Sequence, residues 1–156
     1  MSDRKTQHAT IVIDRKFDAP VSRVFQAWSD IDAKSRWFVG PPGQWTLIKR
    51  TMDFRVGGRD HLSGKLPNGT STIFDSVYHE IVPNERIVYS FDMHLDARHI
   101  TVSLSTVEFA RAGSGTRMTF TEQIVNLDDW EDADGRNRRE GTSGQFDRLA
   151  EALKRD

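Results

Sequence analysis

The segment GTRMTFTEQIV, residues 115–125, has the alternation of a β-strand and places a carboxylate among apolar side chains. Successive side chains of a strand point to opposite faces, so Met118, Phe120 and Ile124 share one face. The same period puts Glu122 on that apolar face. A carboxylate is tolerated at such a position only where the face borders the mouth of a partly hydrated cavity, or where an arginine meets it.

Strand-like patterns occur over residues 9–17 and through most of the chain after residue 43, and they predict a series of strands. They are expected over residues 9–17, 44–56 (as one strand or two), 59–66, 71–82, 85–95, 99–110 and 115–125. Between Leu104 and Val107 the apolar residues change parity, which predicts a β-bulge near Ser105 and Thr106. Residues 1–8 are expected to be a flexible end and residues 126–134 an acidic loop.

Two short helices are predicted after the first strand. Apolar residues at positions 21, 24, 25 and 28 form one face of a helix, and Pro20 suits its first turn. Asp30 is expected to cap a second short helix that ends near Trp37. The Gly- and Pro-rich residues 38–43 then predict a loop.

A long helix is predicted over residues 136–154. Its apolar face is formed by Thr142, Phe146, Leu149 and Leu153. The segment also contains Gly141 and Gly144, each of which costs up to about 1 kcal/mol in a helix interior. Either the helix begins or bends at these glycines, or they leave room beside it. Gly141 flanks the apolar face and Gly144 points away from it, so only Gly141 is expected to widen an internal space.

This order of elements predicts a single α+β domain spanning residues 1–156. Runs of strands flanked by helices indicate an antiparallel sheet, here of about seven strands, rather than a parallel sheet. The last helix is the only predicted element long enough to cover the apolar face of the sheet. A twisted sheet that curves around one helix leaves a tapered space between them, which we expect to be a cavity.

Composition excludes several classes of protein and site. The net charge of −1 offers no electrostatic footprint for nucleic acid or for an anionic membrane. There are no cysteines, no apolar run of about 20 residues and no apolar segment in MSDRKTQHAT, so we expect a soluble cytoplasmic protein. The five histidines are scattered over separate elements, and neither a phosphate-binding loop nor a nucleophile elbow is present. We therefore expect no metal and no cofactor.

Several motifs, taken in order, resemble one family. They are FDAP at residues 17–20 with Val24, Phe25 and Trp28, RWF at 36–38, RVGGR at 55–59, EIVPNER at 80–86, GTR at 115–117, TFTEQ at 119–123 and REGT at 139–142. The chain thereby resembles the START-like, or SRPBCC, helix-grip superfamily, and within it the bacterial stand-alone form of the heat-shock-protein ATPase activator homologues. The resemblance implies a seven-stranded sheet wrapped on the C-terminal helix, with a hydrophobic cavity between them.

The expected cavity wall combines the resemblance with the apolar strand faces. It comprises Trp37, Phe38, Leu62, Phe74, Tyr78, Tyr89, Phe91, Met93, Met118, Phe120, Glu122, Phe146 and Leu149. Glu122 is the first candidate for an acid or base in it. Further candidates by parity or position are Asp60, His61, Tyr78, Tyr89 and His99. Arg138 and Arg139 are possible partners of Glu122, and such a pair would make the glutamate structural.

Three functions are compatible with this pattern. The favoured one is binding of a small hydrophobic molecule in the cavity. The second is a polyketide cyclase- or dehydratase-like enzyme that uses a cavity acid or base. The third is a co-chaperone that activates the ATPase of a heat-shock protein. Eukaryotic members of the family add a separate chaperone-binding domain, for which 156 residues leave no room. A chaperone partner is therefore the least favoured. The sequence is also compatible with a homodimer.

Overall fold

The computed structural model describes residues 6–127 and 135–154. Within these residues, seven strands form one antiparallel sheet in the order β1-β7-β6-β5-β4-β3-β2. The elements are β1 (Gln7–Phe17), α1 (Val21–Ser29), α2 (Ile31–Ser35), β2 (Thr46–Met52), β3 (Arg59–Lys65), β4 (Ser71–Val82), β5 (Arg86–Leu95), β6 (Arg98–Ala112), β7 (Gly115–Asn126) and α3 (Arg136–Lys154). The α+β class and the order of elements are as predicted.

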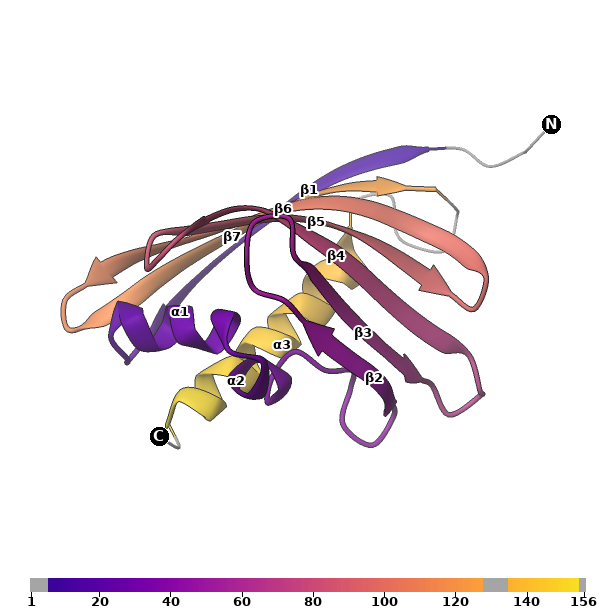
Figure 1. Cartoon of the computed structure of the whole chain (residues 1–156), viewed down its shortest axis with the longest axis horizontal. Helices are drawn as coiled ribbons and strands as arrows, with labels where there is room; N and C mark the ends of the chain where they lie inside the picture. Colours follow the sequence, from indigo (N-terminus) through magenta and orange to yellow (C-terminus); the bar gives the residue numbers. More distant parts are fainter. Residues whose placement is uncertain (1–5, 128–134, 155–156) are drawn as a thin grey trace.

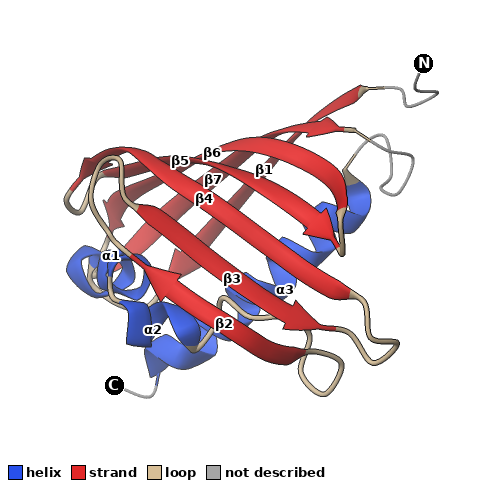
Figure 2. Cartoon of the chain, turned by 45° about the vertical axis from the view of Figure 1, so that its right-hand side comes forward, coloured by secondary structure: helices blue, strands red, loops and turns tan. Residues whose placement is uncertain are grey.

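The sheet curves, and α3 lies across its concave side (Figure 1). The short helices α1 and α2 cover one end of the same side, as Figure 2 also shows. This arrangement confirms the helix-grip fold. None of the helices in the described residues has both the length and the apolar character needed to cross a membrane.

The helix boundaries follow from local chemistry. Pro20 is the N-cap of α1, with an extended backbone that its ring favours. The side chain of Asp30 accepts a hydrogen bond of 2.9 Å from the backbone N–H of Ala33, so it caps α2 as predicted. Helix α3 runs without interruption through Gly141 and Gly144, and the four side chains of its predicted apolar face are the buried ones.

Two strand predictions need correction. β1 begins at Gln7, which pairs with Asn126 of β7, so the first strand takes in residues assigned to the flexible end. The predicted bulge at Ser105 and Thr106 is absent, because β6 keeps an unbroken register there with β5 and with β7. Register shifts occur instead at Leu47/Lys49, Tyr78/Glu80 and Met93/His94.

The inner face of β6 is polar where the apolar pattern suggested otherwise. Thr101, Ser103 and Ser105 point inward and are buried. Leu104 points outward and is 43% exposed. The alternation of β6 is therefore regular, but along half of the strand it carries hydroxyl groups on the concave side of the sheet.

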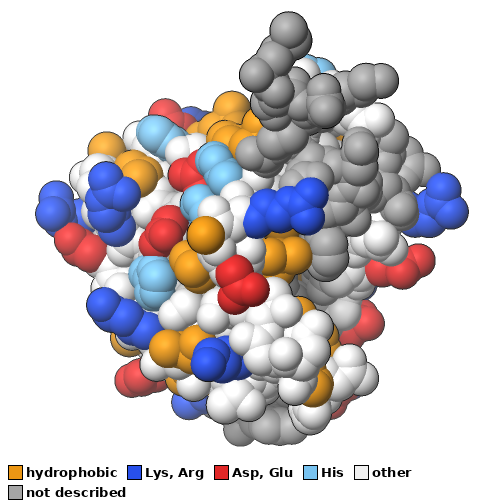
Figure 3. All heavy atoms as spheres, turned by 90° about the vertical axis from the view of Figure 1, so that its right-hand side faces the viewer, with side chains coloured by type: hydrophobic (Ala, Val, Ile, Leu, Met, Phe, Trp, Pro, Cys, Tyr) orange, Lys and Arg blue, Asp and Glu red, His pale blue; other side chains and the backbone are white. Residues whose placement is uncertain are grey.

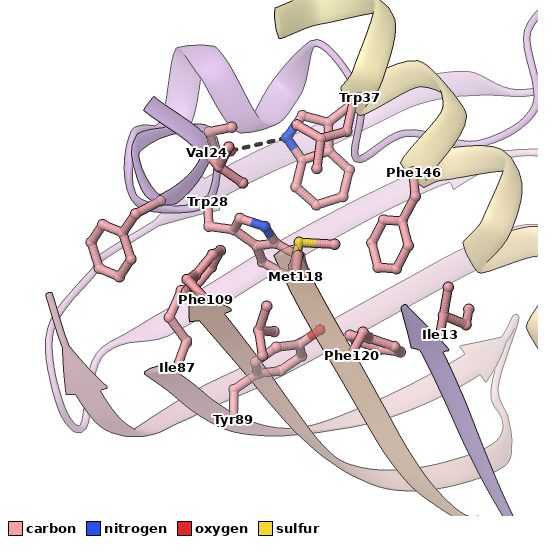
Figure 4. Packing of buried hydrophobic residues seen from close by; sticks show 14 of the residues in the cluster. Ile13, Val24, Trp28, Trp37, Ile87, Tyr89, Phe109, Met118, Phe120 and Phe146 are labelled. Carbon is pink, nitrogen blue, oxygen red and sulfur yellow. Dashed lines mark hydrogen bonds between the residues drawn. The ribbon is translucent and has the colours of Figure 1, made fainter. Parts of the chain in front are cut away.

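Buried side chains from α1, α3 and the sheet pack against one another where these elements meet (Figure 4). The ring of Trp28 on α1 lies 4.8 Å from that of Trp37 and 6.1 Å from that of Phe146 on α3. It also stacks on Phe120 of β7 at 6.5 Å. The indole N–H of Trp37 donates to the carbonyl of Ala27 at 2.9 Å, so the buried indole keeps a hydrogen bond. This end of the grip, the space between the curved sheet and α3, is filled by aromatic side chains.

Candidate functional site

A cavity of about 540 Å³ lies at the other end of the grip, between the sheet, the first half of α3 and the loop after α2. Its volume falls in the range of small-molecule sites. The lining residues come from the loop (Phe38, Val39, Gly40 and Pro41), from the strands (Phe74, Tyr89, Phe91, Met93, Phe120 and Glu122) and from α3 (Asn137, Arg138, Glu140, Gly141, Thr142, Gly144, Gln145 and Arg148).

The two glycines of α3 help to keep this space open. A Cβ atom at Gly141 would have no heavy atom within 4 Å, and one at Gly144 would meet only the end of Arg148, at 3.9 Å. Both glycines line the cavity. The expectation that only Gly141 would widen it is wrong, because the cavity lies along the flank of α3 rather than directly under its apolar face.

The structure brings together a large part of the predicted wall. The predicted residues that line the cavity are Phe38, Phe74, Tyr89, Phe91, Met93, Phe120 and Glu122. Leu62 lines a smaller chamber of about 200 Å³ that adjoins the main one. The smaller chamber is lined further by Trp45, Leu66 and Thr72.

The other predicted wall residues do not line the cavity. Trp37, Tyr78, Met118, Phe146 and Leu149 are at most 2% exposed and belong to the packed core. Most of them lie where α1 and the second half of α3 press against the sheet, so their own side chains fill that part of the space between sheet and helix. The cavity is thus confined to one end of the grip.

Glu122 is both a wall residue and a partner of an arginine. Its carboxylate is 1% exposed and accepts hydrogen bonds from Arg138 of α3 and, at 2.6 Å, from the hydroxyl of Ser103. Arg138 also donates to the hydroxyl of Thr101 at 2.8 Å. Arg139, the alternative partner, donates to the carbonyl of Val12 instead. The inward hydroxyls of Thr101 and Ser103 therefore complete a polar network around the ion pair.

Tyr89 is the other acid/base candidate that reaches the cavity. Burial raises the pKa of its hydroxyl, and the nearby carboxylate of Glu122 raises it further. At neutral pH this hydroxyl is therefore protonated and available as a hydrogen-bond donor. The carboxylate and the phenol are the polar groups that the strands contribute to the cavity, and α3 contributes further polar and charged side chains.

His61 and His99 lie on the outer face of the sheet, so placing them in the cavity was wrong. A ring nitrogen of His61 lies 2.7 Å from Asp75, and one of His99 lies 2.8 Å from Asp92. Figure 3 shows histidine side chains beside acidic ones on one face of the molecule. Among the described residues, no three His, Asp or Glu side chains are placed to hold a metal ion.

Asp60 and Tyr78 belong to a buried cluster outside the cavity. The ammonium of Lys34 lies 2.7 Å from the Asp60 carboxylate, which also accepts from Tyr78 at 2.9 Å and from Arg50. Desolvation lowers the pKa of Lys34, although Asp60 opposes this. Burial alone would raise the pKa of Asp60, but Lys34 and Arg50 hold it below its usual value. The ammonium also lies 4.6 Å from the ring centre of Phe38, a cavity residue.

The sequence reasoning missed Lys34, Arg50 and Arg148. Arg148 of α3 donates to the carbonyl of Val39 at 2.8 Å, so it joins the helix to the loop that borders the cavity. Burial lowers the pKa of this guanidinium. The loop itself was recognised from its Gly and Pro content, but no local pattern indicated that it would meet α3.

Comparisons with known proteins agree with this architecture. A family model described as activator of Hsp90 ATPase homolog 1-like protein matches residues 18–154. The chain belongs to this family. A solved structure from Rhizobium leguminosarum is 41% identical to this member of the activator of Hsp90 ATPase homologue 1-like family. The match covers 99% of this chain and 100% of the other, with a TM-score of 0.92.

Two further structures extend the similarity. A protein of Rhizobium loti is 34% identical over 95% of this chain and 99% of its own, with a TM-score of 0.86. One of Chromobacterium violaceum is 24% identical over 95% and 99%, with a TM-score of 0.78, and shares the fold. No curated protein matches the sequence. Membership of the activator of Hsp90 ATPase homologue 1-like family confirms the resemblance noted in the sequence, while the role of the cavity rests on its own geometry.

Proposed function

We propose that the protein binds a small hydrophobic molecule in the cavity between the sheet and α3. The observation that carries this proposal is a concave space of about 540 Å³ whose lining includes the rings of Phe38, Phe74, Tyr89, Phe91 and Phe120, together with polar side chains of α3. An aromatic wall with a few polar groups is the usual composition of a site for a small organic ligand.

The charges around the cavity favour a neutral ligand. Glu122 is already paired with Arg138, and the guanidinium of Arg148 is used by the carbonyls of Trp37 and Val39. An anionic ligand would have to displace one of these partners or stay uncompensated. Glu140, the remaining charged residue of the lining, is exposed to water, where a charge–charge contact with a cationic ligand would be weak. A molecule with an aromatic or aliphatic body and one hydroxyl or carbonyl group fits this wall better.

A fluorescent probe tests the proposal directly. The neutral probe N-phenyl-1-naphthylamine should show saturable enhancement of its emission with the wild-type protein. Gly141→Leu places a side chain in the cavity and should weaken binding at least tenfold. Glu151→Leu adds the same side chain to an exposed position of α3 outside the cavity and serves as the matched control. No saturable binding by the wild type, or equal binding by Gly141→Leu, would refute the proposal.

An acid/base role for Glu122 is a second candidate. It is favoured by one observation, namely that the carboxylate lines the cavity together with the hydroxyl-bearing Tyr89. The ion pair with Arg138 favours an anchoring role instead. If the role is catalytic, Glu122→Gln should abolish turnover of an aromatic polyketide-like substrate and leave binding of the probe intact. Turnover that survives this substitution excludes the carboxylate as the acid or base.

A further inference from the structure

We propose that the smaller chamber is a subsite for the unbranched apolar tail of the same ligand. This inference rests on the proposed function of the main cavity. It adds a ligand class: an elongated neutral molecule whose polar head lies near Glu122 and whose alkyl tail ends against Trp45. Four features of the structure support it.

The first feature is that the two chambers share a wall. Phe38, Phe74 and Met93 line both of them, as do the loop residues 39–41 and Gln145. The two chambers therefore adjoin along these shared residues. Methionine is unbranched and changes rotamer readily, so we expect a rotamer change of Met93 to join the two chambers into one elongated site when a ligand binds.

The second feature is a difference in polarity. The main chamber is bordered by four charged side chains, those of Glu122, Arg138, Glu140 and Arg148. The smaller chamber has no charged residue among the described residues that line it. Its lining includes the aliphatic side chains of Leu62 and Leu66. A ligand with one polar end and one apolar end is therefore oriented by the site, with its apolar end in the smaller chamber.

The third feature is the rigid end wall formed by Trp45. Its indole packs over Gly64 of β3, where a Cβ atom would overlap the ring, and against Gly40 in the same way. The indole N–H donates to the hydroxyl of Thr72 at 2.8 Å. The one hydroxyl of the chamber is thus already engaged, so the surface that Trp45 offers to a ligand is apolar.

The fourth feature is size. A volume of about 200 Å³ accommodates about six methylene groups, if each takes about the share that a water molecule has in the liquid. Each methylene group moved from water into such a chamber should tighten binding up to about fourfold. Affinity should therefore rise with chain length and then reach a plateau when the chamber is full.

A series of 4-alkylphenols tests this inference, since each member has the same neutral aromatic head. Their displacement of N-phenyl-1-naphthylamine gives relative affinities from phenol upward. In the wild type, affinity should rise two- to fourfold per methylene group and level off near six. Leu66→Trp fills the smaller chamber and should flatten the dependence on chain length, while the affinity for phenol itself stays within twofold. Leu47→Trp, at an exposed position outside both chambers, is the matched control.

The outcomes separate the two proposals. If neither the probe nor any alkylphenol binds, the proposed function of the main cavity fails. If the probe and phenol bind but longer chains bind no better, only the tail subsite is overturned. It is also overturned if Leu66→Trp keeps the full wild-type dependence on chain length, because the gain would then come from general hydrophobicity of the ligands.

Discussion

The ammonium of Lys34 and the carboxylate of Asp60 lie 2.7 Å apart, and neither side chain is more than 2% exposed. Arg50 reaches the same carboxylate from β2, and its side chain is 7% exposed. Two cations therefore share one anion in the interior next to the cavity. This imbalance decides how the cluster responds to substitution, because a buried charge is costly mainly when no partner neutralises it.

Removing the carboxylate of Asp60 should lower the free energy of unfolding far more than removing one of the two cations. Asp60→Asn leaves Lys34 and Arg50 close together without a countercharge and should lower the free energy of unfolding by about 3–5 kcal/mol. Lys34→Met leaves a neutral Asp60–Arg50 pair and an apolar side chain of similar length, so its cost should stay below about 1 kcal/mol. Urea unfolding of the two variants measures the difference. Equal losses would show that charge balance does not govern the cluster.

The same cluster should make the fold sensitive to acid. Lys34 and Arg50 keep the pKa of Asp60 below its usual value of 3.8. The unfolded chain therefore binds a proton at Asp60 at a higher pH than the folded protein does. The stabilisation is fully present above pH 3.8 and is lost as the pH falls through the lower folded pKa. Urea midpoints measured from neutral pH downward should drop in this range, and the drop should be smaller in Asp60→Asn.

Alanine should have opposite effects at two glycines. Gly141→Ala meets open space in a helix and should raise the free energy of unfolding by up to about 1 kcal/mol. Gly64→Ala forces its methyl group into the indole of Trp45, so it should destabilise the protein and shift tryptophan emission. Thermal unfolding of the two variants shows directly which substitution stabilises the protein and which destabilises it. A neutral Gly64→Ala would mean that Trp45 is free to move from its place over β3.

The effects of substituting Glu122 and Arg138 on the free energy of unfolding should be strongly coupled. Arg138→Met leaves a carboxylate that is 1% exposed with Ser103 as its hydrogen-bond donor, and should cost about 2–4 kcal/mol. Glu122→Gln should cost less, because the arginine is 14% exposed and reaches water at the cavity. A double-mutant cycle with both changes should give a coupling energy above about 1 kcal/mol. Additive losses would mean that the pair contributes little.

The sequence predicts the fold more fully than the site. Alternation along β7 and the four-residue apolar face of α3 are local patterns, and both are confirmed by burial. The predicted bulge in β6 failed because its parity was judged from hydrophobicity alone. Ser103 and Thr101 point inward because Arg138 and Glu122, which are distant in sequence, satisfy their hydroxyls.

The limits of the cavity depend on tertiary packing that no local pattern contains. Trp37 and Phe146 were expected to border the cavity, yet α1 fills that region with Trp28. Lys34 occurs in a five-residue helix, and its burial requires Asp60 on a strand 26 residues away. Aromatic residues of the core and of a cavity wall have the same spacing in the sequence, because both lie on the inner faces of the same strands.

The register shift at Leu47 and Lys49 has a consequence for self-association. β2 is an edge strand, and Leu47 and Ile48 on it are more than half exposed. An unpaired apolar edge usually invites strand-to-strand addition by another molecule. The extra residue at this position interrupts the regular spacing of backbone donors and acceptors, so a second chain finds no continuous ladder to extend. This irregularity thereby opposes fibril growth from the one margin of the sheet that is rich in exposed aliphatic side chains.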